Sequence, residues 1–396
     1  MQMQTPVSPI IATGYSLREG SPEFDDLGAG LDEAEALGID VVELPVYAWH
    51  LIVNGRPLDR RVADLARALE DRPFGTTVHG PLSINLMDAP DRLSRHEAVL
   101  AASIEITGAI GARHLVVHTG AARGQDDIEV AYSRQRDALA RAGDLAQRAG
   151  ITLCVENVFR FGDVRETATP SKLAGELSAI DHPAVWATLD VSHAYIRSAQ
   201  DRLDPLPEIA ALAPFARHLH LHDSFGRPSQ LWTYDPAEAV AFGEGDLHLP
   251  IGWGGIDWDA VVACGLPADS IAIMELNPRH WRELGEQVPV LRALADRFRL
   301  AAPATVGSAR PGGLPAATPG PPSRRLTPPA RRPSRRRRNA LRPRPEARLT
   351  GRVPARAGDS RGVAQRVCFR RNDLLAAPET CPYIRRDRCG IHAVPC

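Results

Sequence analysis

The sequence is poor in several residue types, and these shortages narrow the class of protein. Its 396 residues include a single lysine, Lys172, and only 5% are aromatic. No stretch approaches the roughly 18 consecutive apolar residues that a membrane-spanning helix needs. The first residues, MQMQTPVSPIIATGYS, show no basic segment followed by a long apolar one. We therefore expect a protein that is neither secreted nor inserted in a membrane.

Cysteine is also scarce over most of the chain. Only Cys154 and Cys264 lie within residues 1–300, which is too few for a disulfide framework. The other four cysteines lie beyond residue 367 without any C-x-x-C spacing, which disfavours a zinc site there. A reducing, cytoplasmic setting is the expected location.

Charge divides the chain near residue 300. The formal net charge is only -1, but residues 301–396 contain 21 arginines and 5 acidic residues, whereas residues 1–300 contain 26 basic and 43 acidic ones. Apolar periodicity also stops there, and a Pro/Arg-rich segment cannot bury enough apolar surface to offset its ordering entropy. We predict a folded domain over 1–300 and a disordered tail over 301–396. The tail is either an appendage without a part in the chemistry, which we favour, or a basic arm for an acidic partner.

Residues 1–300 alternate between short apolar runs and longer stretches of helical periodicity. The runs predict eight strands, at residues 10–16, 40–46, 76–81, 114–120, 152–158, 186–192, 218–224 and 271–277. Eight strand-helix units in about 300 residues are typical of a (β/α)8 TIM barrel, which is an α/β fold, at the upper side of its usual size.

Six of the predicted strands turn polar where they end, although a parallel barrel strand should be nearly all apolar. The residues at these ends are His79, His118, Glu156, Asp190, His220 and Glu275. A single histidine at a strand end is more often a packing residue, but six equivalent positions predict a site at the carboxyl-terminal mouth of the barrel. Imidazoles and carboxylates without a nearby lysine are the donors that Zn, Mn or Co requires. A divalent cation also gives the carboxylates a physical reason to lie together.

Three further residues join this predicted metal site. His193 follows Asp190 by three positions, and the loop GEGDLHLPIGWGGIDW contains Asp246 and His248. A D-x-H pair on a glycine-rich loop is suited to binding another ion.

Other residues are candidates for contacts to a substrate. Asn157 lies beside Glu156, and Arg279 follows MELN. Trp232 lies with Tyr234 in a long loop that could cover a small ligand. The neighbouring histidines of HLHLHD are expected to support the site, with His222 as the substitute if His220 is not the ligand.

Taken together and in order, these motifs resemble the xylose-isomerase-like barrel superfamily, which contains endonuclease IV, the tagatose and psicose 3-epimerases, hydroxypyruvate isomerase and inosose dehydratase. The resemblance covers about residues 10–300. It rests on HGPLSINL, VVHTG, VENV, LDVSHAY, HLHD, DLHLPIGWGGIDW and MELN. It implies the barrel fold and a metal-dependent activity.

In the isomerases and epimerases of this superfamily, the resemblance implies one Mn, Mg or Co ion. The implied ligands are Glu156, Asp190, His220 and Glu275. The two glutamates would stand on opposite sides of a sugar, one removing a proton beside a carbonyl and the other returning it. His193 would then hydrogen-bond a substrate hydroxyl.

In the endonuclease IV branch, the resemblance implies three zinc ions and a phosphodiester substrate. The ligands would be His79, His118 and Glu156 for the first ion, Glu156, Asp190, His220 and Glu275 for the second, and His193, Asp246 and His248 for the third. All nine residue types are present. However, Leu82 stands where that branch carries a tyrosine that enters the DNA stack, and the acidic body repels a polyanion.

From the sequence we favour a divalent-metal-dependent sugar isomerase or epimerase that uses Glu156 and Glu275 as acid and base. The alternative is an endonuclease IV-like phosphodiesterase acting on abasic DNA, in which case nucleic acid is the partner. A non-catalytic barrel whose tail recruits a partner is a third, less favoured hypothesis. The sequence predicts one to three ions and no membrane partner, and it is compatible with a homo-oligomer.

Overall fold

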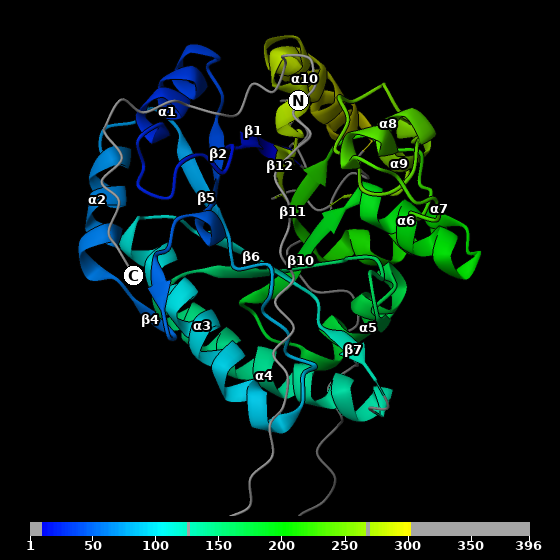
Figure 1. Cartoon of the computed structure of the whole chain (residues 1–396), viewed down its shortest axis with the longest axis horizontal. Helices are drawn as coiled ribbons and strands as arrows, with labels where there is room; N and C mark the ends of the chain where they lie inside the picture. Colours follow the sequence, from blue (N-terminus) through cyan, green and yellow to red (C-terminus); the bar gives the residue numbers. More distant parts are fainter. Residues whose placement is uncertain (1–9, 125–126, 267–269, 302–396) are drawn as a thin grey trace, which may run out of the picture. The chain divides into compact units, whose positions relative to one another are not determined.

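A computed structural model describes residues 10–124, 127–266 and 270–301. Eight parallel strands close into a barrel, which Figure 1 shows surrounded by helices. In order around the barrel they are β1 (Ile10–Ser16), β2 (Val41–Pro45), β5 (Gly75–His79), β6 (His114–His118), β8 (Thr152–Glu156), β10 (Val185–Asp190), β11 (Ala216–Leu221) and β12 (Ser270–Met274). The predicted (β/α)8 fold and all eight predicted strands are confirmed. The predicted tail from residue 302 onward lies outside the described residues.

Helices follow the strands and cover the outside of the barrel. They are α1 (Leu27–Ala36), α2 (Asp59–Leu69), α3 (Pro90–Ala109), α4 (Ile128–Ala149), α5 (Pro170–Ile180), α6 (Val191–Asp201), α7 (Pro205–Leu212), α8 (Ala239–Phe242), α9 (Trp258–Val262) and α10 (Leu284–Ala301). The short 3-10 helices are η1 (Val46–Ala48), η2 (Ala213–Phe215), η3 (Pro236–Glu238) and η4 (Pro278–Glu283). None of the helices in the described part of the chain is long and apolar enough to cross a membrane.

Two short antiparallel pairs lie outside the barrel sheet. One joins β3 (Ile52–Val53) to β4 (Arg56–Pro57). The other joins β7 (Ala121–Arg123) to β9 (Val164–Thr167). Because β7 follows barrel strand β6 and β9 follows β8, this second pair ties together two loops at the carboxyl-terminal mouth.

Local sequence signals explain where the helices begin and end. Asp127 accepts hydrogen bonds from the backbone of Glu129 and Val130 and so caps α4, which ends at Gly150 in the left-handed conformation. At α6 the cap is Asp190, whose Oδ1 accepts from the backbone N–H of His193 at 2.7 Å. The start of α6 thus fixes Oδ1 of Asp190, which is a predicted metal ligand.

The loop after β11 is held by the buried carboxylate of Asp223. Its Oδ2 accepts from the backbone of Gly252 at 2.8 Å and from the indole of Trp258 at 3.2 Å. Its Oδ1 accepts from the backbone of Ser224 and of Ile256. The carboxylate therefore fixes the path of the glycine-rich segment that follows the D-x-H motif.

Replacing Asp223 with alanine should destabilise the fold. The change leaves buried donors without an acceptor, each at a cost of about 1–3 kcal/mol, so we expect the free energy of unfolding in urea to fall by at least about 3 kcal/mol. The matched control is Asp257→Ala, which removes only the exposed cap that bonds the backbone of Ala260 and should cost about 1 kcal/mol. Equal losses in the two variants would contradict this role of Asp223.

Candidate metal centre

The structure brings all nine predicted ligand residues together at the carboxyl ends of the barrel strands. His79, His118, Glu156 and Asp190 end β5, β6, β8 and β10, His193 lies in the first turn of α6, His220 lies in β11, Asp246 and His248 lie in the loop between α8 and α9, and Glu275 follows β12. They form three adjoining groups of donor atoms.

The first group is formed by two imidazoles and one oxygen of Glu156. Nε2 of His79 lies 3.3 Å from Oε2 of Glu156, and Nε2 of His118 lies 3.6 Å from the same oxygen. The two rings meet edge to face with centroids 5.3 Å apart. These three donors lie within 4.8 Å of one another, which is close enough to bind one ion.

The second group surrounds the ring of His220. Its Nδ1 lies 3.3 Å from Oε1 of Glu156, 3.5 Å from Oε2 of Glu275 and 3.9 Å from Oδ2 of Asp190. The two oxygens of Glu156 therefore face different groups, with Oε2 toward the first and Oε1 toward the second.

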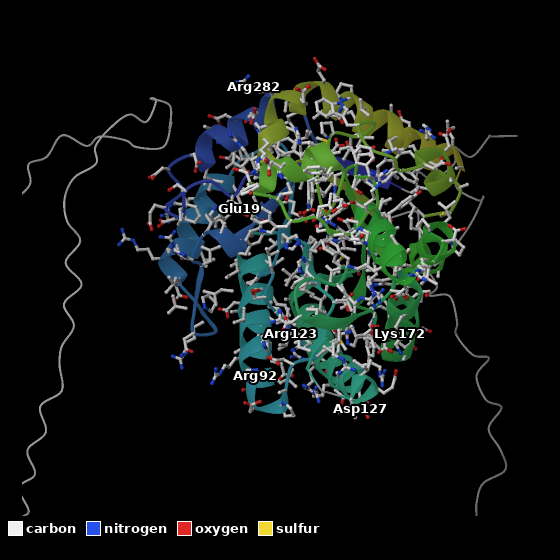
Figure 2. All side chains as sticks on the ribbon, turned by 45° about the vertical axis from the view of Figure 1, so that its right-hand side comes forward. Glu19, Arg92, Arg123, Asp127, Lys172 and Arg282 are labelled. Atoms are coloured by element: carbon white, nitrogen blue, oxygen red, sulfur yellow. The ribbon has the colours of Figure 1, made fainter. Side chains whose placement is uncertain are left out.

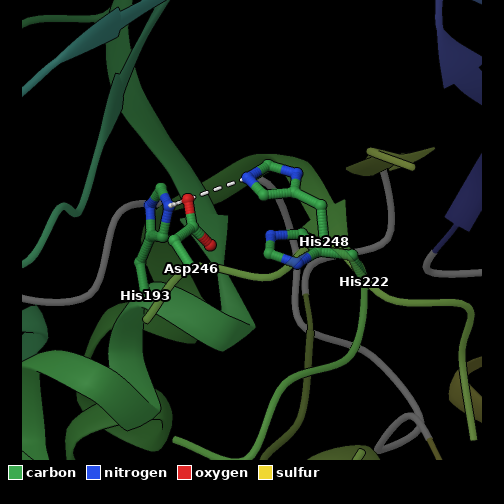
Figure 3. A group of neighbouring side chains, drawn as sticks. All are labelled: His193, His222, Asp246 and His248. Carbon is green, nitrogen blue, oxygen red and sulfur yellow. Dashed lines mark hydrogen bonds and ion pairs between the residues drawn. The ribbon is translucent and has the colours of Figure 1, made fainter. Parts of the chain in front are cut away.

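The third group surrounds Asp246, as Figure 3 shows. Oδ2 of Asp246 lies 3.1 Å from Nε2 of His193 and 2.8 Å from Nε2 of His248. The ring of His222 stacks on His248 with centroids 3.9 Å apart, and its Nε2 lies 3.0 Å from Oδ2 of Asp190. His222 thus lies with the donors of the third group, His193, Asp246 and His248, whereas His220 lies with Glu156 and Asp190.

Several buried polar atoms of these groups have no hydrogen-bond partner among the described residues. They are Oε2 of Glu156, Nδ1 of His220, Nδ1 of His222 and Oδ1 of Asp246. Buried polar atoms are nearly always satisfied, so unsatisfied ones at a single place indicate a missing partner. Imidazole nitrogens and carboxylate oxygens are donors suited to Zn, Mn or Co. The cluster therefore fits divalent metal ions.

Without metal, the charges of the cluster are balanced by protons. Burial lowers the pKa of the His79 imidazole, but the Glu156 carboxylate outweighs that effect and raises it to about 9. Burial likewise opposes protonation of His248, and Asp246 raises its pKa to about 9. At His118 burial prevails and lowers the pKa to about 4. Metal binding would displace the protons of His79 and His248, because a ligating imidazole must be neutral.

The pKa values of the carboxylates in the three groups are lowered, with one exception. Burial alone would raise the pKa of Glu156, yet the imidazoles of His220, His193 and His79 hold it well below its usual range. For Glu275, burial prevails and raises the pKa. Among the carboxylates of the three groups, it is the one whose pKa is raised.

Of the three remaining predicted substrate contacts, one lies against a predicted ligand, and two lie away from the cavities next to the cluster. Asn157 is buried, with its amide donating to the Asp190 carbonyl at 2.9 Å and accepting from the Asp190 backbone at 3.0 Å, so it positions Asp190. Trp232 is 75% exposed and packs against Tyr234. Nη2 of Arg279 lies 3.9 Å from Oδ1 of Asp235. Neither Trp232 nor Arg279 lines the two cavities next to the cluster.

Sequence reasoning overlooked Glu43, which lies in the middle of β2. It is fully buried, and its carboxylate contacts the rings of His218 and His220. Burial would raise its pKa, but these imidazoles lower it to about 2. A charged residue within the otherwise apolar run VVELP was the available signal.

Two cavities meet at the cluster, and His118, His193, Asp246 and Leu82 line both. The smaller, of about 290 Å³, also reaches Glu275 and Arg18. The larger, of about 610 Å³, has an apolar wall that includes Phe159 and Phe161. It extends to Arg92 and Arg123, which are both labelled in the lower part of Figure 2. Both volumes suit a small molecule.

A closed barrel with a histidine and carboxylate cluster at the carboxyl ends of its strands defines the general class of the protein. Residues 31–264 match the sequence profile of the xylose isomerase-like TIM barrel family, and the chain belongs to this family. It is 27% identical over 249 residues to proteins named probable endonuclease 4 from Mycobacterium bovis and Mycobacterium tuberculosis, covering 62% of this chain and 88% of each relative.

Solved structures with the same fold include an epimerase-like protein and a protein soaked with a zinc salt. One is a D-tagatose 3-epimerase-like protein, with a TM-score of 0.56 and 19% identity, covering 72% of this chain and 98% of the other. Another is a protein from Thermus thermophilus soaked with ZnCl2, with a TM-score of 0.51, 22% identity and the same coverage. At these identities the likeness concerns the fold.

Proposed function

We propose that the protein hydrolyses a phosphate ester at a centre of several divalent ions, and most directly a phosphodiester. The observation that carries this proposal is the placement of Glu156. Its Oε2 faces the imidazoles of His79 and His118, while its Oε1 faces His220 and lies 3.2 Å from Nδ1 of His193. A carboxylate whose two oxygens face separate imidazole pairs is placed to bridge two ions. This differs from the one-ion isomerase that the sequence favours.

The ions would be held by the first group (His79, His118), the second group (Asp190, His220, Glu275) and the third group (His193, His222, Asp246, His248), with Glu156 shared by the first two. When bound, such ions polarise phosphoryl oxygens and lower the pKa of a coordinated water. Arg18, in the smaller cavity, would attract the phosphate.

The size and walls of the cavities favour a small ester over a DNA duplex. Leu82 lines both cavities and is 45% exposed. A leucine side chain has no aromatic ring that could stack on a base. Residues 1–300 carry a large excess of acidic side chains, which opposes binding of a polyanion. The apolar wall with Phe159 and Phe161 would receive an organic group of the ester.

A sugar isomerase or epimerase is the second candidate, favoured by one further observation. Glu156 and Glu275 approach the same atom, Nδ1 of His220, at 3.3 and 3.5 Å. Two carboxylates around a single ion position are the arrangement that proton removal and return beside a carbonyl would use.

The test compares three reactions with one preparation of the full-length protein loaded with Zn or Mn. We expect release of p-nitrophenol from bis(p-nitrophenyl) phosphate, abolished by a chelator and restored by the metal. We expect little cleavage of a duplex with one abasic site, and no exchange of carbon-bound hydrogen for deuterium in ketohexoses. Deuterium exchange without phosphoester hydrolysis would overturn the proposal and favour the second candidate. A Glu156→Gln variant, which should be inactive, is the control for contaminating phosphatase.

A further inference from the structure

A carboxylate lies inside the barrel beneath the candidate metal centre. It belongs to Glu43 of β2 and, like the ring of His220, is completely buried. We infer that Glu43 is a positioning residue that holds the ring of His220 with Nδ1 aimed at the metal. This inference rests on the metal binding assumed in the proposed function, but not on which reaction follows.

The contacts between the two side chains are specific. Nε2 of His220 lies 3.2 Å from Oε1 and 3.3 Å from Oε2 of Glu43. The other ring nitrogen, Nδ1, has no hydrogen bond among the described residues and faces Glu156, Asp190 and Glu275. One edge of the ring thus meets Glu43, and the opposite edge meets the predicted ligands of the second group.

This division of the two nitrogens determines what His220 can do. A hydrogen bond to Glu43 places the proton of the neutral imidazole on Nε2, which leaves the lone pair of Nδ1 free to bind an ion. It also fixes the ring plane and makes the ligand nitrogen more basic. Carboxylates that accept from the second nitrogen of a ligating histidine typically contribute 10–100-fold to metal affinity.

Glu43 is itself held in place by side chains of β1 and β11. Oγ of Ser16 on β1 donates to Oε1 at 3.0 Å, and the two residues are register partners. Nε2 of His218 on β11 lies 3.3 Å from Oε2 and 3.4 Å from Oγ1 of Thr77 on β5. With both oxygens fixed, Glu43 cannot swing into the metal centre and act as a ligand without losing these contacts.

The experiment compares Glu43→Gln and Glu43→Ala with Asp40→Asn in the full-length protein. Asp40 is a matched control because its carboxylate also joins the first two strands, by bonds to the backbone and hydroxyl of Thr13, but contacts none of the predicted ligands. The probe is Co(II), followed by its visible absorption during competition with a chelator. Thermal unfolding of each metal-free variant reports whether it folds.

We expect Glu43→Ala to weaken one Co(II) site about 10–100-fold and to change the absorption of that site, while the remaining sites keep their affinity. Glu43→Gln keeps an acceptor for Nε2 and should lose less. Asp40→Asn should match the unaltered protein. If Glu43→Ala does not fold, Glu43→Gln decides alone, because its size is unchanged and its affinity must still fall measurably.

Unchanged Co(II) affinity and absorption in the folded Glu43 variants would overturn this inference while leaving the proposed function intact. An equal loss in Asp40→Asn would overturn it as well, because the effect would then come from the strands in general. If the unaltered protein binds no Co(II), the proposed function and this inference fail together. If it binds Co(II) with an affinity that depends on Glu43 but hydrolyses no phosphoester, only the proposed function fails.

Discussion

Replacing His79 or Asp246 with alanine lowers kcat for bis(p-nitrophenyl) phosphate by about a thousandfold, if the centre works with several ions. His79 belongs to the first group but also lies within 4.8 Å of donor atoms of His220 and Glu275, whereas Asp246 belongs to the third group. Asp246→Ala is therefore the sharper of the two variants against a single ion held around His220. Loss of one ion removes several kcal/mol of charge stabilisation in the transition state, and each ~1.4 kcal/mol is a factor of ten in rate. Steady-state kinetics at saturating metal measures the effect.

The control for these variants is His182→Ala. His182 lies 3.3 Å from Asp144, outside the cluster, so its loss should leave kcat unchanged. Substantial activity in both His79→Ala and Asp246→Ala would contradict the account. A one-ion isomerase mechanism would predict that these two variants keep their isomerase activity.

Removing the metal should change how thermal stability depends on pH. The pKa values of His79 and His248 are about 9 in the folded, metal-free protein, against 6.5 for the ordinary imidazole. Their contribution to stability is fully present below about pH 6.5 and is lost as the pH rises through 9. The Tm of the metal-free protein should therefore fall by several degrees over this window, as ~1 kcal/mol is about 2–4 °C in a domain of this size.

The metal-loaded protein should behave differently over the same pH range. Its imidazoles are already neutral, and fewer protons compete with the ions as the pH rises. The difference in Tm between the loaded and metal-free forms should therefore widen from pH 6.5 to 9, as differential scanning fluorimetry with and without chelator would measure. Parallel curves would show that these histidines do not exchange protons for metal.

Much of the fold could be predicted because the barrel imposes a strict pattern on the sequence. A strand buried on both faces reads as a short apolar run, so polar residues at strand ends are conspicuous. In such runs His118 after LVV and Glu156 after LCV could be recognised as polar strand ends. The D-x-H motif of Asp246 and His248 could be predicted from its spacing and glycine-rich surroundings, although its contact with His193 depends on the tertiary fold.

The separate contacts of the three histidines in HLHLHD depend on tertiary packing. His218, His220 and His222 recur with a period of two and therefore point to the same side of β11. Their sequence does not say that His218 lies below the centre with Glu43 while His222 lies beside His248. The β7–β9 pair, which ties together two loops beside the cavity, likewise joins segments about 40 residues apart, which no local pattern indicates.

Metal content per chain tests the central claim most directly. The full-length protein, purified without chelator and supplied with Zn, would be measured by elemental mass spectrometry against protein concentration, beside Glu156→Ala. The donor groups around His79, His220 and Asp246 predict about three ions per chain, and at least one fewer in Glu156→Ala, since Glu156 is shared by the first two groups. A single ion, retained in His79→Ala and Asp246→Ala, would contradict a centre of several ions and restore the isomerase hypothesis.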